Sequence, residues 1–324
     1  MRGLVSVTCG TAALGCVLVP PAAEHSRGRL CHTQHSRGRL CHKGCHRGYV
    51  LVMVLVLLAI AAAAMAGVCR ASMLKAVRAA SAADELQRRW TVLRCRAVLL
   101  PKAEAVLSRG EGRESEVRRE IIVGGQPVTL VFGDEQAKAN VNSIYRATGL
   151  AGAERVVRQV VGNIDHVAVE LKPLPEIGRP DDEEPPPVFE TLGQVFGHTP
   201  PNVLVNPPGS SITCSLTCWG DGSLMLRRAS RAALRAACSR TIGGAQIDRL
   251  VQIRGKHPDL EIPELLDQLK LTESARAALD DLLVDESTCH SLWIICRSAE
   301  RSWYDLSVQD DSSEAAGTPR VFSW

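Results

Sequence analysis

A short polar run in the middle of the chain holds the residues best suited to chemistry. Residues 134–142 read DEQAKANVN and contain Asp134, Glu135, Lys138, Asn140 and Asn142. In an extended strand two adjacent carboxyl side chains point to opposite faces, which is poor geometry for a paired general acid and base. Asparagine side chains can instead bond nearby backbone groups and fix a turn or a helix start. We therefore favour a structural role for this run over a catalytic one.

An acidic run and a Cys/His repeat are the candidate metal ligands. Asp181, Asp182, Glu183 and Glu184 could bind Ca²⁺ through carboxylate oxygens. A solvated charge run in a Pro-rich loop is the commoner origin of such a sequence. Residues 25–32 and 35–42 both read HSRGRLCH, whose ligand types suit zinc, but a tandem repeat in an unstructured leader is the interpretation we prefer. We expect no cofactor and no metal, with calcium left open at residues 181–184.

Signatures of the common enzyme classes are missing from the sequence. It contains no GxSxG, no HExxH and no P-loop, and its histidines are scattered without ligand spacing. We therefore predict a protein that is not an enzyme. The alternative of an exported hydrolase would require a cleft with perturbed titratable groups, which sequence cannot reveal.

The twelve cysteines leave disulfide pairing open. Cys214 and Cys218 are close enough in sequence to pair, and buried free thiols are an equal alternative. Cys289 and Cys296 are seven positions apart, so on one regular strand they would lie on opposite faces.

An apolar segment near the N-terminus predicts a single membrane span. Residues 49–69 contain 21 positions without a charge, and about 20 apolar residues suffice to cross a bilayer as a helix. The residues before it carry one acid, Glu24, against seven basic residues: Arg2, Arg27, Arg29, Arg37, Arg39, Lys43 and Arg47. The positive-inside rule then places the N-terminus in the cytoplasm and the rest outside the inner membrane, in the periplasm. A cleaved signal peptide is the alternative.

Composition is compatible with a folded exported part. Hydrophobic residues make up 45% of the 324 residues and charged residues 23%, which excludes wholesale disorder. The net charge of +3 makes a protein that coats nucleic acid unexpected. We divide the chain into a basic leader, 1–48; the span, 49–69; an amphipathic helix continuation, 70–118; a hairpin and first helical segment, 119–172; a Pro-rich acidic linker, 173–210; a second helical segment, 211–285; returning strands, 286–310; and a tail, 311–324.

Local patterns predict the elements within these segments. Gly124-Gly125 between two β-rich runs predicts a hairpin, and residues 291–297 and 303–308 predict a second one. Helices are expected at about 151–161, 230–238, 245–254, 263–269 and 274–284. Pro101 should bend or end the long first helix. The stripe predicted to pack that helix against the exported domain is Ala79, Ala80, Ala82, Ala83, Leu86, Trp90, Leu93 and Val98.

A turn at residues 241–245 suggests a second functional class. Its sequence TIGGA between two helices resembles a helix-hairpin-helix turn, whose backbone N–H groups can meet DNA phosphates. Basic residues nearby could add contacts: Arg227, Arg228, Arg231, Arg235 and Arg240. Because the domain is predicted to lie outside the cytoplasm, a nucleic-acid partner is the less favoured alternative.

The start of the apolar segment resembles a type IV prepilin leader. His46-Arg47-Gly48-Tyr49 precedes the span, and Met53 stands at the fifth position after Gly48, where most prepilins carry Glu. This departure is typical of the general secretion pathway protein K family, the large minor pseudopilin of type II secretion. Residues 128–145 resemble that family's strand followed by Asp134, Glu135, Lys138, Asn140 and Asn142. Residues 217–230 and 247–254 resemble its second helical segment, with Met225 where an Asn is expected, and residues 285–296 resemble a strand that returns to the sheet.

The resemblance implies a fold, a processing event and partners. The fold would be α+β: a long N-terminal transmembrane helix, a small pilin-like antiparallel sheet, and an inserted all-helical domain that is SAM-like or helix-hairpin-helix-like. A prepilin peptidase would cut between Gly48 and Tyr49, and Tyr49 would be methylated. The expected partners are other minor pseudopilins and the inner-membrane platform of the secretion system. The expected role is to cap or initiate a short pseudopilus.

Overall fold

The computed structural model describes residues 46–109, 114–162, 167–174, 189–205, 212–297, 301–311 and 319–323. The chain divides into two units, residues 1–71 and 72–324, which are taken separately below. The HSRGRLCH repeats and the acidic run at 181–184 lie outside the described residues, so the predictions made for them stay predictions.

Helix α1, His46–Leu99, contains the apolar segment. Within the first unit its side chains from Tyr49 onward are all exposed. Among the described residues it is the one helix long and apolar enough to cross a membrane. This agrees with the predicted single span, because a soluble helix of this composition would bury its apolar side chains.

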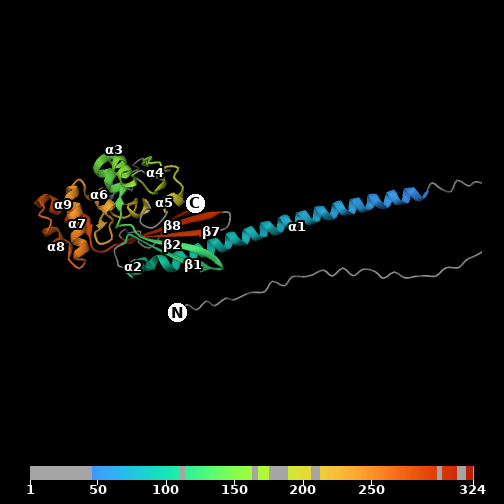
Figure 1. The fold of residues 1–324 in the computed structure, drawn as a ribbon, viewed down its shortest axis with the longest axis horizontal. Helices are drawn as coiled ribbons and strands as arrows, with labels where there is room; N and C mark the ends of the chain where they lie inside the picture. Colours follow the sequence, from blue (N-terminus) through green and yellow to red (C-terminus); the bar gives the residue numbers. More distant parts are fainter. Residues whose placement is uncertain are drawn as a thin grey trace, which may run out of the picture. The chain divides into compact units, whose positions relative to one another are not determined.

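The second unit is built on a five-stranded antiparallel sheet in the order β1-β2-β7-β8-β9 (Figure 1). The strands are β1, Glu116–Val123; β2, Gln126–Asp134; β7, Cys289–Arg297; β8, Ser302–Asp310; and β9, Arg320–Ser323. Gly124 and Gly125 join β1 to β2 with φ of +59° and +82°, the left-handed conformations of a two-residue turn, and the predicted hairpin is confirmed. The predicted pairing of the next two strands is also confirmed, as β7 with β8.

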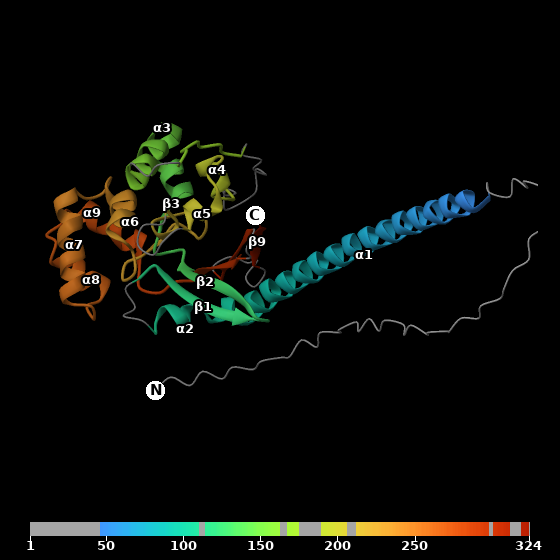
Figure 2. The ribbon, with the colours of Figure 1, turned by 45° about the vertical axis from the view of Figure 1, so that its right-hand side comes forward.

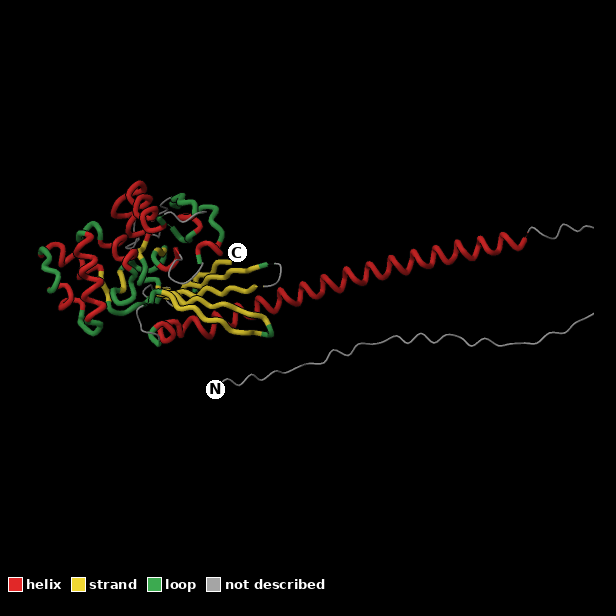
Figure 3. Tube along the Cα trace, viewed as in Figure 1, coloured by secondary structure: helices red, strands yellow, loops and turns green. Residues whose placement is uncertain are grey.

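A helical region is inserted between two neighbouring strands of the sheet. β2 and β7 are hydrogen-bonded, with Val131 opposite Trp293, yet residues 135–288 lie between them in sequence. Strands form one layer and most helices of this unit belong to the insertion (Figure 3). The predicted α+β architecture with a small antiparallel sheet and an inserted helical domain is confirmed.

The end of α1 covers one face of this sheet. Val92 and Cys95 pack with Leu130 and Ile294 in one hydrophobic core. At Pro101 the helix passes into a 3₁₀ turn, Leu100–Lys102, followed by α2, Ala103–Leu107, as the predicted end near Pro101 requires. Arg88 adds a polar contact between α1 and β8 by donating from Nη1 to Asp305 Oδ2 at 3.1 Å.

The predicted packing stripe of α1 is wrong. Leu86, Trp90 and Leu93 are 58%, 55% and 45% exposed, and Val98 and the four alanines are exposed as well. The face that packs consists of Arg88, Thr91, Val92, Cys95 and Leu99. The two stripes are offset by two residues, about 200° around a helix. Both repeat at helical spacing, so periodicity alone could not choose between them.

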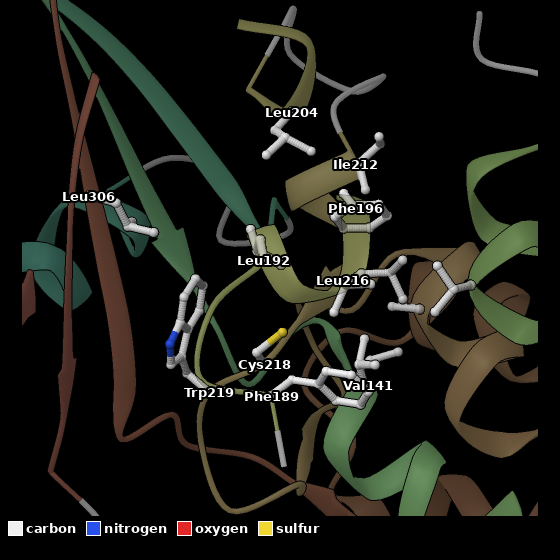
Figure 4. Close-up of a cluster of buried hydrophobic side chains, with 14 of the residues drawn as sticks. Val141, Phe189, Leu192, Phe196, Leu204, Ile212, Leu216, Cys218, Trp219 and Leu306 are labelled. Carbon is white, nitrogen blue, oxygen red and sulfur yellow. The ribbon is translucent and has the colours of Figure 1, made fainter. Parts of the chain in front are cut away.

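The other face of the sheet supports the first part of the insertion. Helices α3, Val141–Val161; α4, Gly193–Phe196; and α5, Pro201–Leu204 pack there with the 3₁₀ turn Ile212–Cys214. A short parallel pair, β3, Ala139–Asn140, and β4, Leu216–Thr217, lies beside them. Leu192, Phe196 and Leu216 come together in this core (Figure 4).

Two sequence predictions in this part require correction. Residues 189–205 were assigned to the Pro-rich linker, but Phe189, Val195 and Phe196 are fully buried core residues. The first helix of the insertion was expected at 151–161 and begins ten residues earlier, because Asn140 caps it and Gly149, at φ +69°, bends it rather than ending it.

The second part of the insertion forms its own core around α6, Arg231–Cys238; α7, Gly244–Lys256; α8, Ile262–Asp267; and α9, Glu273–Leu282 (Figure 2). These match the four short helices predicted for residues 211–285. A parallel pair, β5, Leu224–Met225, and β6, Leu283–Val284, ties the start of this part to its end. Arg254 donates from Nη1 to the carbonyls of Leu226 and Ala229, at 2.6 and 2.7 Å.

Candidate functional site

The polar run at residues 134–142 lies where β2 leaves the sheet and the insertion begins. Asp134, Glu135 and Lys138 are at most 1% exposed, although each is an ionisable residue. Charged groups at such depth are stable only when they are paired and hydrogen-bonded. Together with Arg228, Glu104 and Glu116 they form a buried charge cluster, the name used below for these six residues.

Glu135 and Lys138 form the centre of the buried charge cluster. Lys138 Nζ lies 2.6 Å from Glu135 Oε1 and 3.1 Å from Glu116 Oε1. Hydroxyls of Thr217, from β4, and Ser291, from β7, each donate to Glu135 at 2.5 Å. Burial alone would lower the pKa of Lys138, but the charges of Glu135 and Glu116 outweigh it and raise that pKa above its usual value. Lys138 is therefore charged at neutral pH.

Asp134 belongs to a second ion pair. Arg228 donates from Nη1 to Asp134 Oδ2 at 3.0 Å, and from Nη1 and Nη2 to the two carboxylate oxygens of Glu104 at 2.7 Å each. The Ser287 hydroxyl and the Ala137 N–H also donate to Asp134, at 2.7 and 3.1 Å. The guanidinium of Arg228 thus links α2, the end of β2 and the turn before α6.

Of the three residues Arg228, Asp134 and Glu104, only Glu104 is partly exposed, with 48% of its side chain open to solvent. The hydrogen bonds from Arg228, with smaller contributions from Ser108 and His290, lower the pKa of Glu104 to about 2. His290 Nε2 lies 3.0 Å from Glu104 Oε2, so β7 is also connected to α2.

The two asparagines of the run fix the start of α3. Asn140 Oδ1 accepts the N–H of Ser143, and its amide donates to the carbonyls of Trp219 and Gly220, at 2.9 and 3.2 Å. Asn142 exchanges hydrogen bonds with the backbone of Phe189, and its amide also donates to Cys218 O at 2.9 Å. Residues 189 and 218–220 are held against α3 by these side chains, which is the role in a turn or helix start expected from the sequence.

The arrangement joins elements rather than presenting reactive groups. The two adjacent carboxylates belong to separate ion pairs, and each already accepts at least three hydrogen bonds or ion-pair contacts. No substrate could reach Asp134 or Glu135 without breaking these contacts, since both are at most 1% exposed. The buried charge cluster connects the sheet, α2 and both parts of the insertion at one point.

The sequence pointed to Asp134, Glu135 and Lys138, but not to Glu116, Glu104 and Arg228, which complete the cluster. Arg228 was considered only as a possible DNA contact, but its side chain is 5% exposed and ion-paired. The other four arginines of that group also bind groups of this chain. Arg227 contacts Asp285, Arg231 and Arg235 contact Asp248, and Arg240 donates to Ala147 O.

The described cysteines, Cys69, Cys95, Cys214, Cys218, Cys238, Cys289 and Cys296, are all free thiols. Cys289 and Cys296 pack in the cores on opposite faces of the sheet, as their spacing predicted. Burial raises the pKa of the Cys238 thiol to about 12 and that of Cys296 to about 11. Thiols with such pKa values carry almost no thiolate at neutral pH and are poor nucleophiles.

The remaining predicted sites stay predictions. Gly48 and Tyr49 both lie within α1, and nothing in the structure tests cleavage between them. Within the described residues no group of three or more His, Cys, Asp or Glu side chains could hold a metal ion. The calcium candidates, Asp181, Asp182, Glu183 and Glu184, lie outside that part of the chain.

Comparison with known proteins gives a structural similarity. No family model matches the chain, and no curated protein matches it in sequence. A chain of the GspK-GspI-GspJ complex from the type 2 secretion system of enterotoxigenic Escherichia coli is similar in structure, with a TM-score of 0.42 and 12% sequence identity. The similarity covers 76% of this chain and 98% of that chain.

Proposed function

We propose that the protein is a minor pseudopilin-like subunit that caps or initiates the pseudopilus of a type II secretion system. It would be anchored in the inner membrane by α1, with its N-terminus cytoplasmic and the rest periplasmic, and would assemble with other minor pseudopilins on the inner-membrane platform. It would catalyse no reaction. Its one covalent event would be processing and methylation by a prepilin peptidase at Gly48–Tyr49.

The observation that carries this proposal is the topology of residues 72–324. A small antiparallel sheet packs on the last turns of an apolar helix, and a two-part helical region interrupts it between β2 and β7. The first feature suits a subunit that assembles through its helix. The second adds a bulky domain, which would obstruct the addition of a further subunit and so suits the tip.

A free stripe on α1 supports assembly through that helix. Opposite the face that packs on the sheet, the exposed positions step along the helix by four and three residues in alternation: Ser72, Ala76, Ala79, Ala83, Leu86, Trp90, Leu93 and Ala97. Such spacing is that of a helix seam that packs against another helix. This seam is mostly small residues up to Ala83 and large ones from Leu86 to Leu93, so a partner helix could approach closely along its first half.

The position of Met53 supports a place at the tip. In the resembling family of pilins, Glu at this position neutralises the N-terminus of the subunit ahead. A tip subunit has no subunit ahead, so a carboxylate there would be buried in lipid without a partner, at a cost of up to about 2.5–3.5 kcal/mol. Met53 avoids that cost.

The decisive experiment is the mature N-terminus of the full chain co-expressed with a prepilin peptidase, determined by intact mass and terminal sequencing. We expect a product that begins at methylated Tyr49. Gly48→Val should block processing, whereas Gly44→Val, a matched change four residues earlier in the leader, should not. A product beginning after Ala64 or nearby would identify an ordinary signal peptide and refute the proposal, and an uncut chain would refute it as well.

A further inference from the structure

A groove between α3 and α6 lies apart from the buried charge cluster. It has a volume of about 380 Å³, within the range of small-ligand sites. Its apolar lining comes from Val156 and Val160 on α3 and from Ala232 and Ala236 on α6. Alanines at these two positions of α6 keep the groove open, because larger side chains there would fill it.

The rim of the groove is basic. Arg231 and Arg235, one turn apart on α6, line it and share one carboxylate, that of Asp248 on α7. Arg231 contacts both oxygens of Asp248, while Arg235 contributes only Nη2, at 3.1 and 3.3 Å. Two guanidinium groups and one carboxylate leave an excess positive charge at the mouth of the groove.

A third cation lies on the α3 side. Arg155 is exposed and is one turn before Gln159, which lines the groove. Within the part of the chain that the structure describes, Arg155 makes no ion pair. The groove therefore combines an aliphatic floor with two arginines that line its α6 side, and Arg155 is exposed one turn from its α3 lining.

We propose that this groove binds an acidic peptide segment of another protein, with one apolar side chain in the floor and flanking carboxylates on Arg155 and Arg235. Arginine guanidinium groups suit carboxylates because they bind both oxygens at once. A nucleic acid fits less well, because the lining contains no aromatic side chain on which a base could stack. The proposal does not depend on the role in secretion.

The test uses the full chain in detergent micelles and fluorescence anisotropy with three labelled peptides, EEEFEEE, EEEGEEE and KKKFKKK. We expect saturable binding of EEEFEEE, at least about tenfold weaker binding of EEEGEEE, and none of KKKFKKK. Absence of saturable binding of EEEFEEE would overturn the proposal. Equal binding of EEEFEEE and EEEGEEE would also overturn it, since the groove would then contribute nothing.

Three variants locate the binding site, two that should weaken peptide binding and one that should strengthen it. Arg235→Glu and the groove-filling Ala232→Trp should each weaken binding of EEEFEEE about tenfold or more. Asp248→Asn removes the acid that competes for the two arginines and should strengthen binding, a result that misfolding cannot produce. Unchanged binding in Asp248→Asn or in Ala232→Trp would place the peptide elsewhere and refute the proposal.

Two controls separate the groove from general charge attraction. Arg158→Glu makes the same charge change on α3, at a residue that pairs with Glu154 and does not line the groove, and should leave the affinity within about twofold. Competition by a single-stranded DNA oligonucleotide that also responds to Ala232→Trp would assign the groove to nucleic acid instead and overturn the peptide proposal.

Discussion

Lys138 is the residue on which the buried charge cluster depends most. Its ammonium is 1% exposed and is the counter-charge of Glu135, which is equally buried. Removing one partner of such a pair leaves the other charge buried without compensation, and this cost exceeds what the pair itself contributes. Arg228 plays the same part for Asp134, but it retains contact with solvent-accessible Glu104.

Lys138→Met should destabilise the protein by about 3–5 kcal/mol, because Glu135 would be left buried without the ammonium beside it. Lys138→Met combined with Glu135→Gln should recover part of that loss. The measurement is urea unfolding of the full chain in detergent, followed by tryptophan fluorescence. Lys256→Met, at an exposed lysine, is the control and should change the free energy of unfolding by less than about 0.5 kcal/mol. Equal effects at the two lysines would contradict a buried pair.

The lowered pKa of Glu104 predicts how the stability of the protein depends on pH below 4.5. Because hydrogen bonds from Arg228 lower its pKa from 4.5 to about 2 in the folded protein, its contribution is complete above about pH 4.5 and is lost as pH falls toward about 2. Glu104→Gln should lack this contribution at every pH. The difference in melting temperature between wild type and variant should therefore be largest near neutral pH and should shrink between pH 4.5 and 2. A difference that stays constant over that window would disprove the assignment.

At the residue scale, contacts could be predicted from the sequence only between residues that are close together in the chain. Asp134, Glu135, Lys138, Asn140 and Asn142 could be recognised as one unit because nine positions contain them all. Their partners are separated from them by many residues: Arg228 from Asp134 by 94, and Ser291 from Glu135 by 156. No local pattern marks one arginine among several as the buried one, so these contacts required the fold.

Among the elements, α1 has two distinct faces over its last turns. One face, with Val92 and Cys95, is buried against the sheet, and the opposite face, with Leu86, Trp90 and Leu93, is exposed. The buried face contributes to stability, whereas the exposed seam contributes nothing to the folding of this chain. The proposed assembly requires the second face for partners.

Val92→Ala should therefore lower the free energy of unfolding by about 1–2 kcal/mol, and Trp90→Ala should change it by less than about 0.5 kcal/mol. In co-purification with co-expressed minor pseudopilins the order should reverse, with Trp90→Ala losing most of the bound partner. Ile122→Ala, at a residue that is 78% exposed on β1, serves as the control for an exposed apolar side chain outside the seam. Retention of partners by Trp90→Ala would argue against assembly through the seam.

The elements that could be predicted were those with local signals. The Gly-Gly turn and the four short helices have turn residues, caps or periodic apolar positions of their own. β9 has only four residues and was assigned to the tail, since its place depends on pairing with β8 and on the contact of Phe322 with Trp219, whose ring centroids are 5.7 Å apart. Residues 189–205 were assigned to a linker because their prolines and the Pro-rich run before them are typical of a loop, although several side chains in this range are buried.

For the whole molecule, we expect the basic residues before the span to set the proposed orientation across the membrane. A C-terminal alkaline phosphatase fusion should be active and a C-terminal green fluorescent protein fusion dark, since the first needs the periplasm and the second the cytoplasm. Replacing Arg37, Arg39, Lys43 and Arg47 by Glu should reduce the phosphatase signal by weakening the charge difference across the span. An inactive phosphatase fusion together with a fluorescent green fluorescent protein fusion would reverse the proposed topology.

The insertion between β2 and β7 also bears on the order in which the chain can fold. β2 ends at Asp134 and its neighbour in the sheet begins at Cys289, so the central pairing joins the early and late parts of the polypeptide. In the proposed topology the chain would emerge from the membrane in N-to-C order, so the first hairpin would wait with one edge of β2 open until nearly the whole chain had crossed. Contacts this distant in sequence form slowly, and open strand edges invite aggregation. In the proposed topology, the α1 anchor would hold the chain at the membrane during that interval, before any assembly takes place.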